Sequence, residues 1–457
     1  MFESIKQIFK QKELRSKLIY TLVVIVLFRL GCAITVPFLD PSSLSAMVSG
    51  GESSDFLSYL NVLTGGALQD ASIFGLSITP YINASIIMQL LTIAIPALER
   101  MAKEGNDGQK KIQTITRFVT LGLAVAMAIM YYFVLRNSDG VLHYYNGFSG
   151  VFSAIVIIAS FVAGTMLVVW MGDQINEHGV GNGISVILFA GILSRGPDAF
   201  MLLWSWWQLG AEQPKYYFLV PAIIVIFIAI VAFIVFMTNA ERRIPVSYAK
   251  RVVGRKMYGG QSTYIPIKVN MTGVLPIIFA MSFMSLPSMI ESFVTPAEGG
   301  FWAGFFSLFH YNNIFYGVLY FLLILAFNYF YTAIQFNPVE IANSIRKNNG
   351  AIPGIRPGKP TVDYFSKVIS KITLLGAVFL GIIAIFPIVF SMITQANISL
   401  GGTSILIIVG VALETVRNLE SQVIFEEAYD KLLLSPGARP TQPQLPRTGM
   451  DRLFTLR

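Results

Sequence analysis

Charged residues are scarce in this chain of 457 residues. Only 13% are Asp, Glu, Lys or Arg, about half the share of an ordinary soluble protein, whereas 54% are apolar. The mean hydropathy is +0.64. Runs such as Ala222–Met237 and Ile372–Ile393 contain no charge, and a helix of about 20 apolar residues crosses about 30 Å of hydrocarbon. The composition therefore excludes a soluble globular protein and predicts an integral membrane protein that crosses the bilayer many times.

Residue types that bind metals or act as nucleophiles are also scarce. The single cysteine, Cys32, excludes a disulfide framework or a cysteine metal site within one chain. The histidines His143, His178 and His310 fall in predicted loops outside any HExxH pattern, so we expect solvated loop histidines and no metal site. The sequence has no GxxxxGKS or GxxxxGKT phosphate loop, and the apolar runs contain no suitable Ser/His or Asp/Asp pair. We predict neither an enzyme nor a cofactor.

The candidates for charge well inside the apolar runs are Arg29, Glu414 and Arg417. Ion-coupled transporters usually carry an acidic residue at the middle of a span, where the ion needs a ligand. Glu414 and Arg417 lie three residues apart, which allows an ion pair on one helix near its cytoplasmic end. This pattern disfavours ion-coupled transport, but it leaves a facilitator of solute diffusion open.

Ten segments are predicted to span the membrane as helices. They lie near residues 18–37, 75–96, 116–136, 152–171, 181–203, 216–238, 270–290, 314–334, 372–394 and 401–423. The fifth is weak because it is rich in glycine, and the second is interrupted by polar residues. Before the second segment, residues 56–74 are only partly apolar and contain Gly65 and Gly66. This stretch predicts a short helix that enters the membrane without crossing it.

The basic residues predict the orientation. Of the 33 Lys and Arg residues, 28 fall in segments that ten spans place on one side: 1–17, 99–117, 242–268, 346–371 and 431–457. Because basic loops stay inside, this side is cytoplasmic and both termini lie there. We expect no cleavable signal peptide, because Val36-Pro37 and an acidic loop follow the first apolar run in place of a small-residue cleavage site.

Long loops after the first and the sixth span indicate two inverted halves. The first loop is external and the second is cytoplasmic, so each half carries a long loop at the matching place on the opposite side. We predict an N-terminal half over 1–213 and a C-terminal half over 214–435, with large cytoplasmic loops at 239–269 and 335–371. The Pro-rich residues 436–457 are predicted to be a disordered tail.

Four stretches resemble one protein family, and they occur in that family's order. They are GGALQDASIFGLSITPYINASIIMQLL (65–91), ERRIPVSYAKRVVGRKMYGGQSTYIPIKVNMTGVLPIIFA (241–280), PGIRPGKPT (353–361) and GGTSILI (401–407). They are similar to the bacterial branch of the SecY family, the pore-forming subunits of Sec protein translocases. Thr79 and Asn83 depart from this pattern, since bacterial members commonly carry Met and Ser or Thr there, which makes the second span more polar than usual.

The resemblance implies an all-α channel of ten transmembrane helices with a re-entrant plug helix in the cytoplasmic membrane. It implies a passive pore that passes unfolded preproteins and releases hydrophobic segments sideways into membrane lipids. The implied partners are the small membrane subunits SecE and SecG, the SecA ATPase, the ribosome and signal peptides. A solute transporter is the alternative. Co-purification of a SecE-like subunit would distinguish the two, because a transporter need not bring one.

The resemblance also implies four groups of site residues. The pore ring would be Ile82, Ile86, Ile184, Leu188, Ile278 and Ile407. The plug, about 60–74, would include Leu60, Leu63, Gly65, Gly66, Leu68 and Ile73. The lateral gate would be lined by Gln89, Thr92, Gln113, Thr120 and Asn270. SecA and the ribosome would dock on Arg242, Arg243, Arg255, Lys256 and Arg356.

Each group also has a purely structural interpretation. The ring residues could be packed or lipid-facing aliphatics, although Ile82 and Ile86 lie one helical turn apart and so share a face. The plug could be an ordinary re-entrant loop, and the gate residues could serve helix packing. The basic loop residues could serve only to orient the protein in the membrane.

Overall fold

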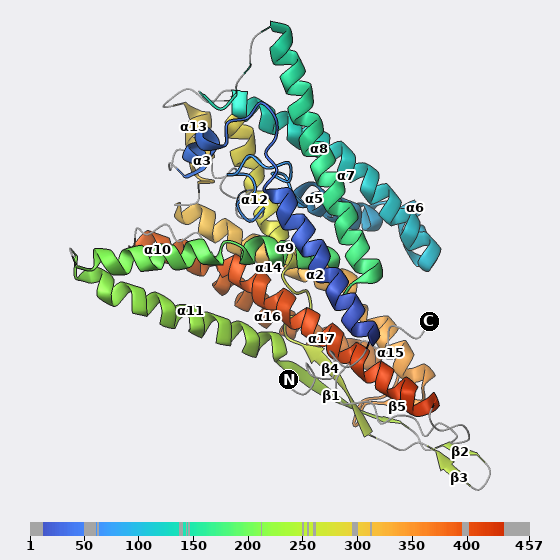
Figure 1. Cartoon of the computed structure of the whole chain (residues 1–457). Helices are drawn as coiled ribbons and strands as arrows, with labels where there is room; N and C mark the ends of the chain where they lie inside the picture. The colour runs from blue at the N-terminus through green and yellow to red at the C-terminus, as the bar shows by residue number, and fades with distance from the viewer. Residues whose placement is uncertain are drawn as a thin grey trace.

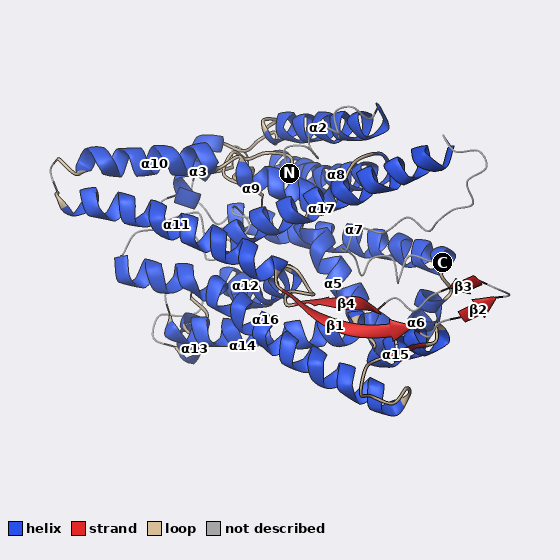
Figure 2. Cartoon of the chain, turned by 90° about the horizontal axis from the view of Figure 1, so that it is seen from below, coloured by secondary structure: helices blue, strands red, loops and turns tan. Residues whose placement is uncertain are grey.

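The computed structural model describes residues 12–49, 61, 64–136, 140–142, 144, 147–211, 213–248, 251–253, 256–258, 262–294, 300–310, 313–394 and 402–433. They form a bundle of long helices with a small group of strands at one end (Figure 1; Figure 2). Leu60, Leu63, Arg255, His143 and the predicted tail 436–457 lie outside the described residues.

Each of the ten predicted spans contains a helix. The first half of the chain holds α2 (Lys12–Cys32), α3 (Pro41–Ser49), α5 (Thr79–Ala94), α6 (Pro96–Lys103), α7 (Asn106–Arg136), α8 (Gly147–His178), α9 (Gly183–Leu193) and α10 (Gly196–Leu209). The second half holds α11 (Lys215–Asn239), α12 (Leu275–Val294), α13 (Phe301–Ser307), α14 (Ile314–Gln335), α15 (Pro338–Lys347), α16 (Lys359–Thr394) and α17 (Gly402–Leu433).

Two of the spans are broken or shortened. The glycine-rich fifth span is divided into α9 and α10. The second begins at Thr79 with Pro80 in its first turn, a position where proline needs no amide partner. It ends before Pro96, and α6 turns away by 101°. Among the described residues, six helices are long and apolar enough to cross a membrane, or seven if this bent pair is one span. The count of ten spans stays a prediction.

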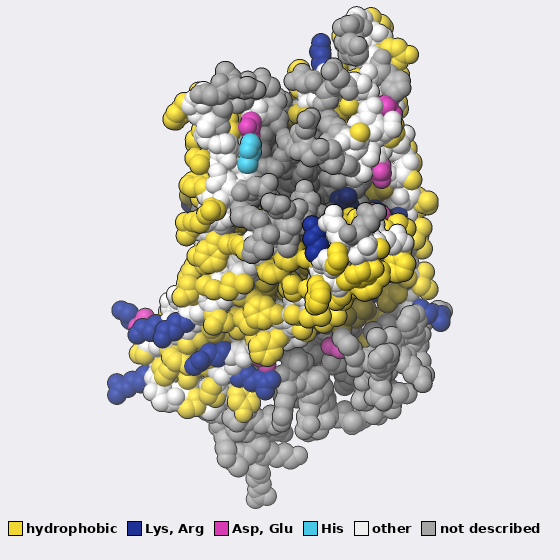
Figure 3. Space-filling view, turned by 90° about the vertical axis from the view of Figure 1, so that its left-hand side faces the viewer, with side chains coloured by type: hydrophobic (Ala, Val, Ile, Leu, Met, Phe, Trp, Pro, Cys, Tyr) yellow, Lys and Arg dark blue, Asp and Glu magenta, His cyan; other side chains and the backbone are white. Residues whose placement is uncertain are grey.

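The outer surface of the bundle is apolar. Figure 3 shows hydrophobic side chains in a broad band across one face, with Lys and Arg gathered mainly at its lower margin. In the most apolar part of α11 only 11% of the residues are buried, against 50% in α16. Phe218 and Phe236 on α11 are 86% and 71% exposed. Exposing so large an apolar surface to water would be unfavourable, so the chain is a multi-pass membrane protein whose outer surface contacts lipid.

The first of the two large predicted cytoplasmic loops, 239–269, contains a long β-hairpin that was not predicted from the sequence. Strand β1 (Glu241–Tyr248) pairs antiparallel with β4 (Ser262–Lys268), and β1 also pairs with β5 (Gly350–Ala351) of the second cytoplasmic loop. Between β1 and β4, β2 (Arg251–Val253) pairs with β3 (Lys256–Tyr258). The alternating Ile244, Val246, Ile265 and Ile267 are buried against α15 and α16. Figures 1 and 2 show the strands beside α15 at one end of the bundle.

Two predicted polar positions are corrected by the structure. Arg417 does not pair with Glu414; it donates hydrogen bonds to the Thr238 carbonyl oxygen, at 3.4 Å, and to the Asn239 side chain. The Arg417 cation bonds a carbonyl oxygen at the C-terminal end of α11, and its positive charge is stabilised by the negative end of that helix's dipole. His178 does not lie in a loop, because it ends α8 and its ring lies 5.7 Å from that of Tyr20.

Candidate channel constriction, plug and gate

The six residues of the predicted pore ring lie in one hydrophobic cluster. Helix α5 contributes Ile82 and Ile86, α9 contributes Ile184 and Leu188, and α12 and α17 contribute Ile278 and Ile407. Ile82, Leu188, Ile278 and Ile407 are between 2% and 8% exposed, and the other two are half-buried. Four helices from both predicted halves thus bring aliphatic side chains to one place.

Local sequence holds α9 at this cluster. The Asn182 side chain accepts hydrogen bonds from the Ile184 and Ser185 amides and so begins the helix. A Cβ atom at Gly183 would lie 2.0 Å from the carbonyl oxygen of Gly172, so only glycine allows α9 to approach α8 this closely. The turn at Asn182 and Gly183 therefore fixes the position of Ile184 and Leu188.

Of the predicted plug, about 60–74, the structure describes Asn61, which is helical, and residues 64–74, which together with 75–78 form successive turns and not a regular helix. Gly65 and Gly66 have φ angles of 64° and 90°, which favour glycine. Ala67 and Phe74 are buried in the same cluster as the pore ring. Leu68 is buried in a neighbouring cluster, against which Ile73 packs. The segment therefore lies directly beside the ring.

Main-chain hydrogen bonds attach the segment to the residues that follow α2. The Val36 amide donates to the Ala71 carbonyl oxygen at 2.8 Å, and the Ile73 amide donates to the Ile34 carbonyl oxygen at 3.0 Å. The Ser72 hydroxyl donates to the Gly31 carbonyl oxygen at 3.3 Å. The segment is thus held by its backbone as well as by apolar packing.

Three helices meet the segment at glycine residues. A Cβ atom at Gly164 of α8 would lie 2.1 Å from the Ile73 carbonyl oxygen, and one at Gly31 of α2 would meet the Phe74 ring at 2.1 Å. A Cβ atom at Gly65 of the segment would lie 2.0 Å from the carbonyl oxygen of Gly191 in α9. We call Gly31 and Gly164 the glycine seat. A side chain at Gly31 or Gly164 would push against the segment.

The predicted gate residues do not form one hydrogen-bonded seam in the described structure. Thr92 and Thr120 donate to carbonyl oxygens of their own helices, those of Met88 and Thr116. Gln113 is exposed and Gln89 is half-buried. The buried Oδ1 atom of Asn270, just before α12, has no hydrogen-bond partner among the described residues.

Helix α12 does meet both α5 and α7, but this contact is much smaller than that between α5 and α7. Because the contact is small, separating α12 from α5 and α7 would break few packing contacts, as a lateral opening between them requires. Two polar groups on α5, the Thr79 hydroxyl and the Asn83 Oδ1 atom, are buried without a partner among the described residues, and no role was predicted for them. Their departure from the family pattern could have indicated them.

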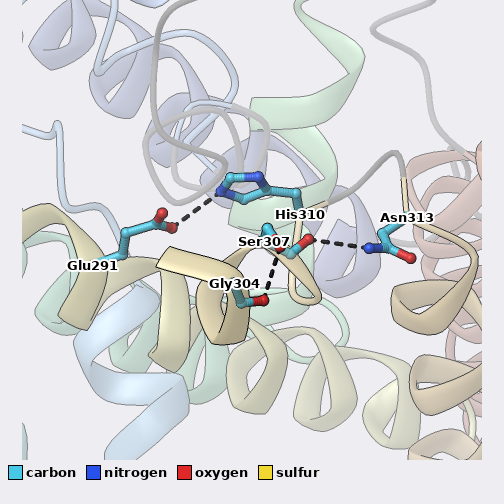
Figure 4. Close-up of polar contacts among 5 residues, drawn as sticks. All are labelled: Glu291, Gly304, Ser307, His310 and Asn313. Atoms are coloured by element: carbon cyan, nitrogen blue, oxygen red, sulfur yellow. Dashed lines mark hydrogen bonds and ion pairs between the residues drawn. The ribbon is translucent and has the colours of Figure 1, made fainter. Parts of the chain in front are cut away.

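The far end of α12 is tied to the chain between α13 and α14. Figure 4 shows the His310 ring directed at the Glu291 carboxylate, with 3.1 Å between Nε2 and Oε2. The Ser307 hydroxyl donates to the Gly304 carbonyl oxygen, and the Asn313 side chain donates to the Ser307 carbonyl oxygen. His310 thus has a carboxylate partner and is not simply solvated, as the sequence analysis expected.

The predicted docking residues lie in the cytoplasmic loops. Arg242 and Arg243 are exposed on β1, and Arg243 Nε donates to Glu241 Oε1 at 2.7 Å. Lys256 begins β3. Arg356 is exposed in a turn between Gly354 and Gly358, whose φ angles are 83° and 113°, and the Thr361 hydroxyl donates to its carbonyl oxygen at 2.9 Å. The turn presents the Arg356 side chain to solvent.

Comparison with known proteins identifies the family. The SecY family model matches residues 72–416. The chain is 41% identical over 428 residues to the protein translocase subunit SecY of Aquifex aeolicus, covering 93% of this chain and 98% of that protein. The chain belongs to the SecY family. Within this SecY-family chain, the matched region contains the ring, the described gate residues and both cytoplasmic loops.

Solved structures show the same fold. A SecY protein with a plug domain has a TM-score of 0.62 at 18% identity, covering 93% of this chain and 95% of that chain. Sec61 in a canine ribosome–channel complex has a TM-score of 0.58 at 18% identity, covering 93% and 95%. These likenesses concern the fold alone. They place this SecY-family chain among helical protein-conducting channels by architecture.

Proposed function

We propose that this chain is the channel subunit of a protein translocase in the cytoplasmic membrane. It passes unfolded polypeptides across the membrane and releases hydrophobic segments sideways into lipid. The single observation that supports this most is the cluster in which four helices bring the six ring residues together beside a re-entrant segment. An apolar constriction expels water and so blocks ions, while flexible aliphatic side chains can fit around a passing chain.

The channel itself is passive, so a partner supplies the energy. SecA or a ribosome docks on the cytoplasmic hairpin and on the Arg356 turn, and SecE and SecG complete the membrane complex. The exposed Arg242, Arg243 and Arg356 support this assignment because they present cations where ribosomal phosphates or an acidic motor surface could bind. The fold resembles that of Sec61, which was solved in a ribosome–channel complex.

Co-purification tests the proposal against the solute-transporter alternative. A tagged chain extracted in mild detergent should bring a small helical SecE-like subunit and should bind SecA or ribosomes in a salt-sensitive manner. A complex that contains neither, and that moves a small solute in vesicles, would contradict the proposal.

Replacing Arg356 by Glu should slow transport and leave folding intact. The side chain is exposed and its turn is held by glycines and by Thr361, so no apolar burial depends on the arginine. We expect normal amounts of membrane complex and reduced SecA-driven or ribosome-coupled translocation into vesicles. Lys359→Glu, a nearby exposed cation at the start of α16, is the control for charge alone. Loss of the Arg356→Glu protein from the membrane would instead make the residue structural.

Replacing Gly164 by Ala should unseat the re-entrant segment. The added methyl group would meet the Ile73 carbonyl oxygen, and overpacking of this kind costs about 1–3 kcal/mol. Gly191→Ala is the matched control, because its Cβ would lie 3.8 Å from the Thr64 carbonyl oxygen, an ordinary contact. We expect higher ion leak through reconstituted Gly164→Ala channels only. Equal leak from both variants would exclude the glycine seat as the device that holds the segment.

A further inference from the structure

An irregular segment, residues 269–274, joins the cytoplasmic hairpin to α12. We call it the root of α12. The Val269 amide donates to the Ala240 carbonyl oxygen at 2.9 Å, which ties the root to the end of α11 and the start of β1. On its other side, a Cβ atom at Gly376 of α16 would lie 2.5 Å from the Val269 carbonyl oxygen. The root is therefore pressed closely on α16.

One buried amide joins the root to two helices. The Thr272 hydroxyl of the root donates to Asn328 Oδ1 of α14 at 2.6 Å. Asn328 Nδ2 then donates to the Thr373 carbonyl oxygen of α16 at 3.0 Å. Thr272, Asn328 and Thr373 are 5%, 3% and 2% exposed. In such surroundings water does not compete for the hydrogen bonds, so each contributes more than it would at a surface.

Two further buried oxygen atoms, one in the root and one in α16, lack a hydrogen-bond partner among the described residues. They are the Oδ1 atom of Asn270 and the hydroxyl oxygen of Thr373. Buried polar groups are nearly always paired, and an unpaired one costs free energy. Among the described residues, the Asn328 bridge thus supplies the hydrogen bonds that satisfy the buried groups of Thr272 and Asn328 in the arrangement seen here.

The root also leads directly to the pore ring. Val274 packs against the cluster that contains the ring and against the cluster of the second half of the chain. Ile278, a ring residue, follows one helical turn later. A shift of the root would therefore move a ring side chain and the start of the helix that contacts α5 and α7.

We propose that Asn328 is a positioning residue of the channel, which clamps the root of α12 to α14 and α16 and so holds Ile278 in the closed constriction. The inference rests on the proposed function, because it assumes that the ring closes a pore and that α12 moves when the pore opens. Asn328 acts through Thr272 and touches no substrate. Weakening the clamp should favour the open channel.

The test compares two threonine substitutions of the same shape within one cluster. Thr272→Val removes the hydroxyl that bonds Asn328, whereas Thr373→Val removes a hydroxyl without a partner and leaves the backbone carbonyl in place. Each variant is purified as the membrane complex, and ion leak is measured in planar bilayers. Export of a reporter with a shortened signal peptide is measured in cells.

Thr272→Val should raise both leak and export of the defective reporter about fivefold, the factor that corresponds to one buried neutral hydrogen bond. Thr373→Val should behave as the wild type, and Thr272→Ser, which restores the hydroxyl, should return both readouts to normal. Equal behaviour of the two valine variants, or no rescue by serine, would overturn the clamp.

A second substitution keeps the test decisive if Thr272→Val does not accumulate. Asn328→Gln retains both polar groups but displaces them by one methylene, so it should also raise leak, and wild-type behaviour would overturn the proposal. Failure of the proposed function is distinguishable. In that case substitutions in the ring itself would leave conductance unchanged, whereas failure of the clamp alone would leave the ring variants leaky and the Thr272→Val variant tight.

Discussion

A covalent link between α5 and α12 is expected to stop protein transport while the complex stays assembled. A signal peptide must leave the pore sideways, because its apolar stretch gains about 25 cal/mol for each Å² moved from water to lipid. The wall must therefore open between two helices. The small contact between α12 and the pair α5 and α7 supports a seam at this place.

The link is made with introduced cysteines in a Cys32→Ser background. Ile86→Cys is combined in turn with Ser282→Cys, Phe283→Cys or Leu286→Cys, which together cover one turn of α12. Oxidation, or a short thiol crosslinker, should join at least one pair in the idle channel and abolish secretion of a preprotein. Reduction of the disulfide should restore it.

The matched control joins two helices of one half. Tyr131 of α7 and Phe161 of α8 lie with their rings 5.1 Å apart, so a short crosslinker between cysteines at these positions does not cross the seam. This link should leave secretion near normal. If the α5–α12 link also leaves secretion normal, the lateral opening lies between other helices.

Opening the ring should turn the idle channel into an ion leak. Replacing Ile82, Ile86 and Ile278 together with Gly removes three of the six ring side chains from the cluster and admits water to the constriction. We expect ion conductance of reconstituted complexes to rise by an order of magnitude or more, since a dry constriction becomes a wetted one.

The control places the same kind of change on the outer surface. Ile224, Val225 and Ile228 of α11 are exposed, so replacing them with Gly costs similar helix propensity without opening the ring. These variants should stay as tight as the wild type. Conductance that does not differ between the two triple variants would show that the six residues are ordinary core packing.

Much of the fold could be predicted because membrane helices are set by length and apolarity. Each expected span contains a helix, because the backbone of a long uncharged run in lipid must satisfy its hydrogen bonds within the run. The breaks at Pro96 and at the glycine-rich fifth span were also visible in the sequence. The β-hairpin was not, although Ile244 and Val246 alternate with exposed residues, because the run was interpreted only as a basic loop.

The candidate site was predicted only in part, because its polar contacts depend on neighbours distant in sequence. The six ring residues could be assigned from the family resemblance and do lie together. The bridge from Thr272 to Asn328 spans 56 positions, and the contact from Glu291 to His310 spans 19. Periodicity within one helix carries no information about such pairs, so only the packed structure brings them into view.

The attachment of residues 64–78 to the end of α2 has a consequence for how this segment can vary. Its hydrogen bonds at Val36, Ala71, Ile73 and Ile34 join peptide groups, which every residue except proline can supply. The attachment should therefore survive many exchanges of side chains but not the loss or gain of a single residue within 34–36 or within 71–73. Such a change would shift the donors past their acceptors. In this segment, length is more tightly constrained than composition.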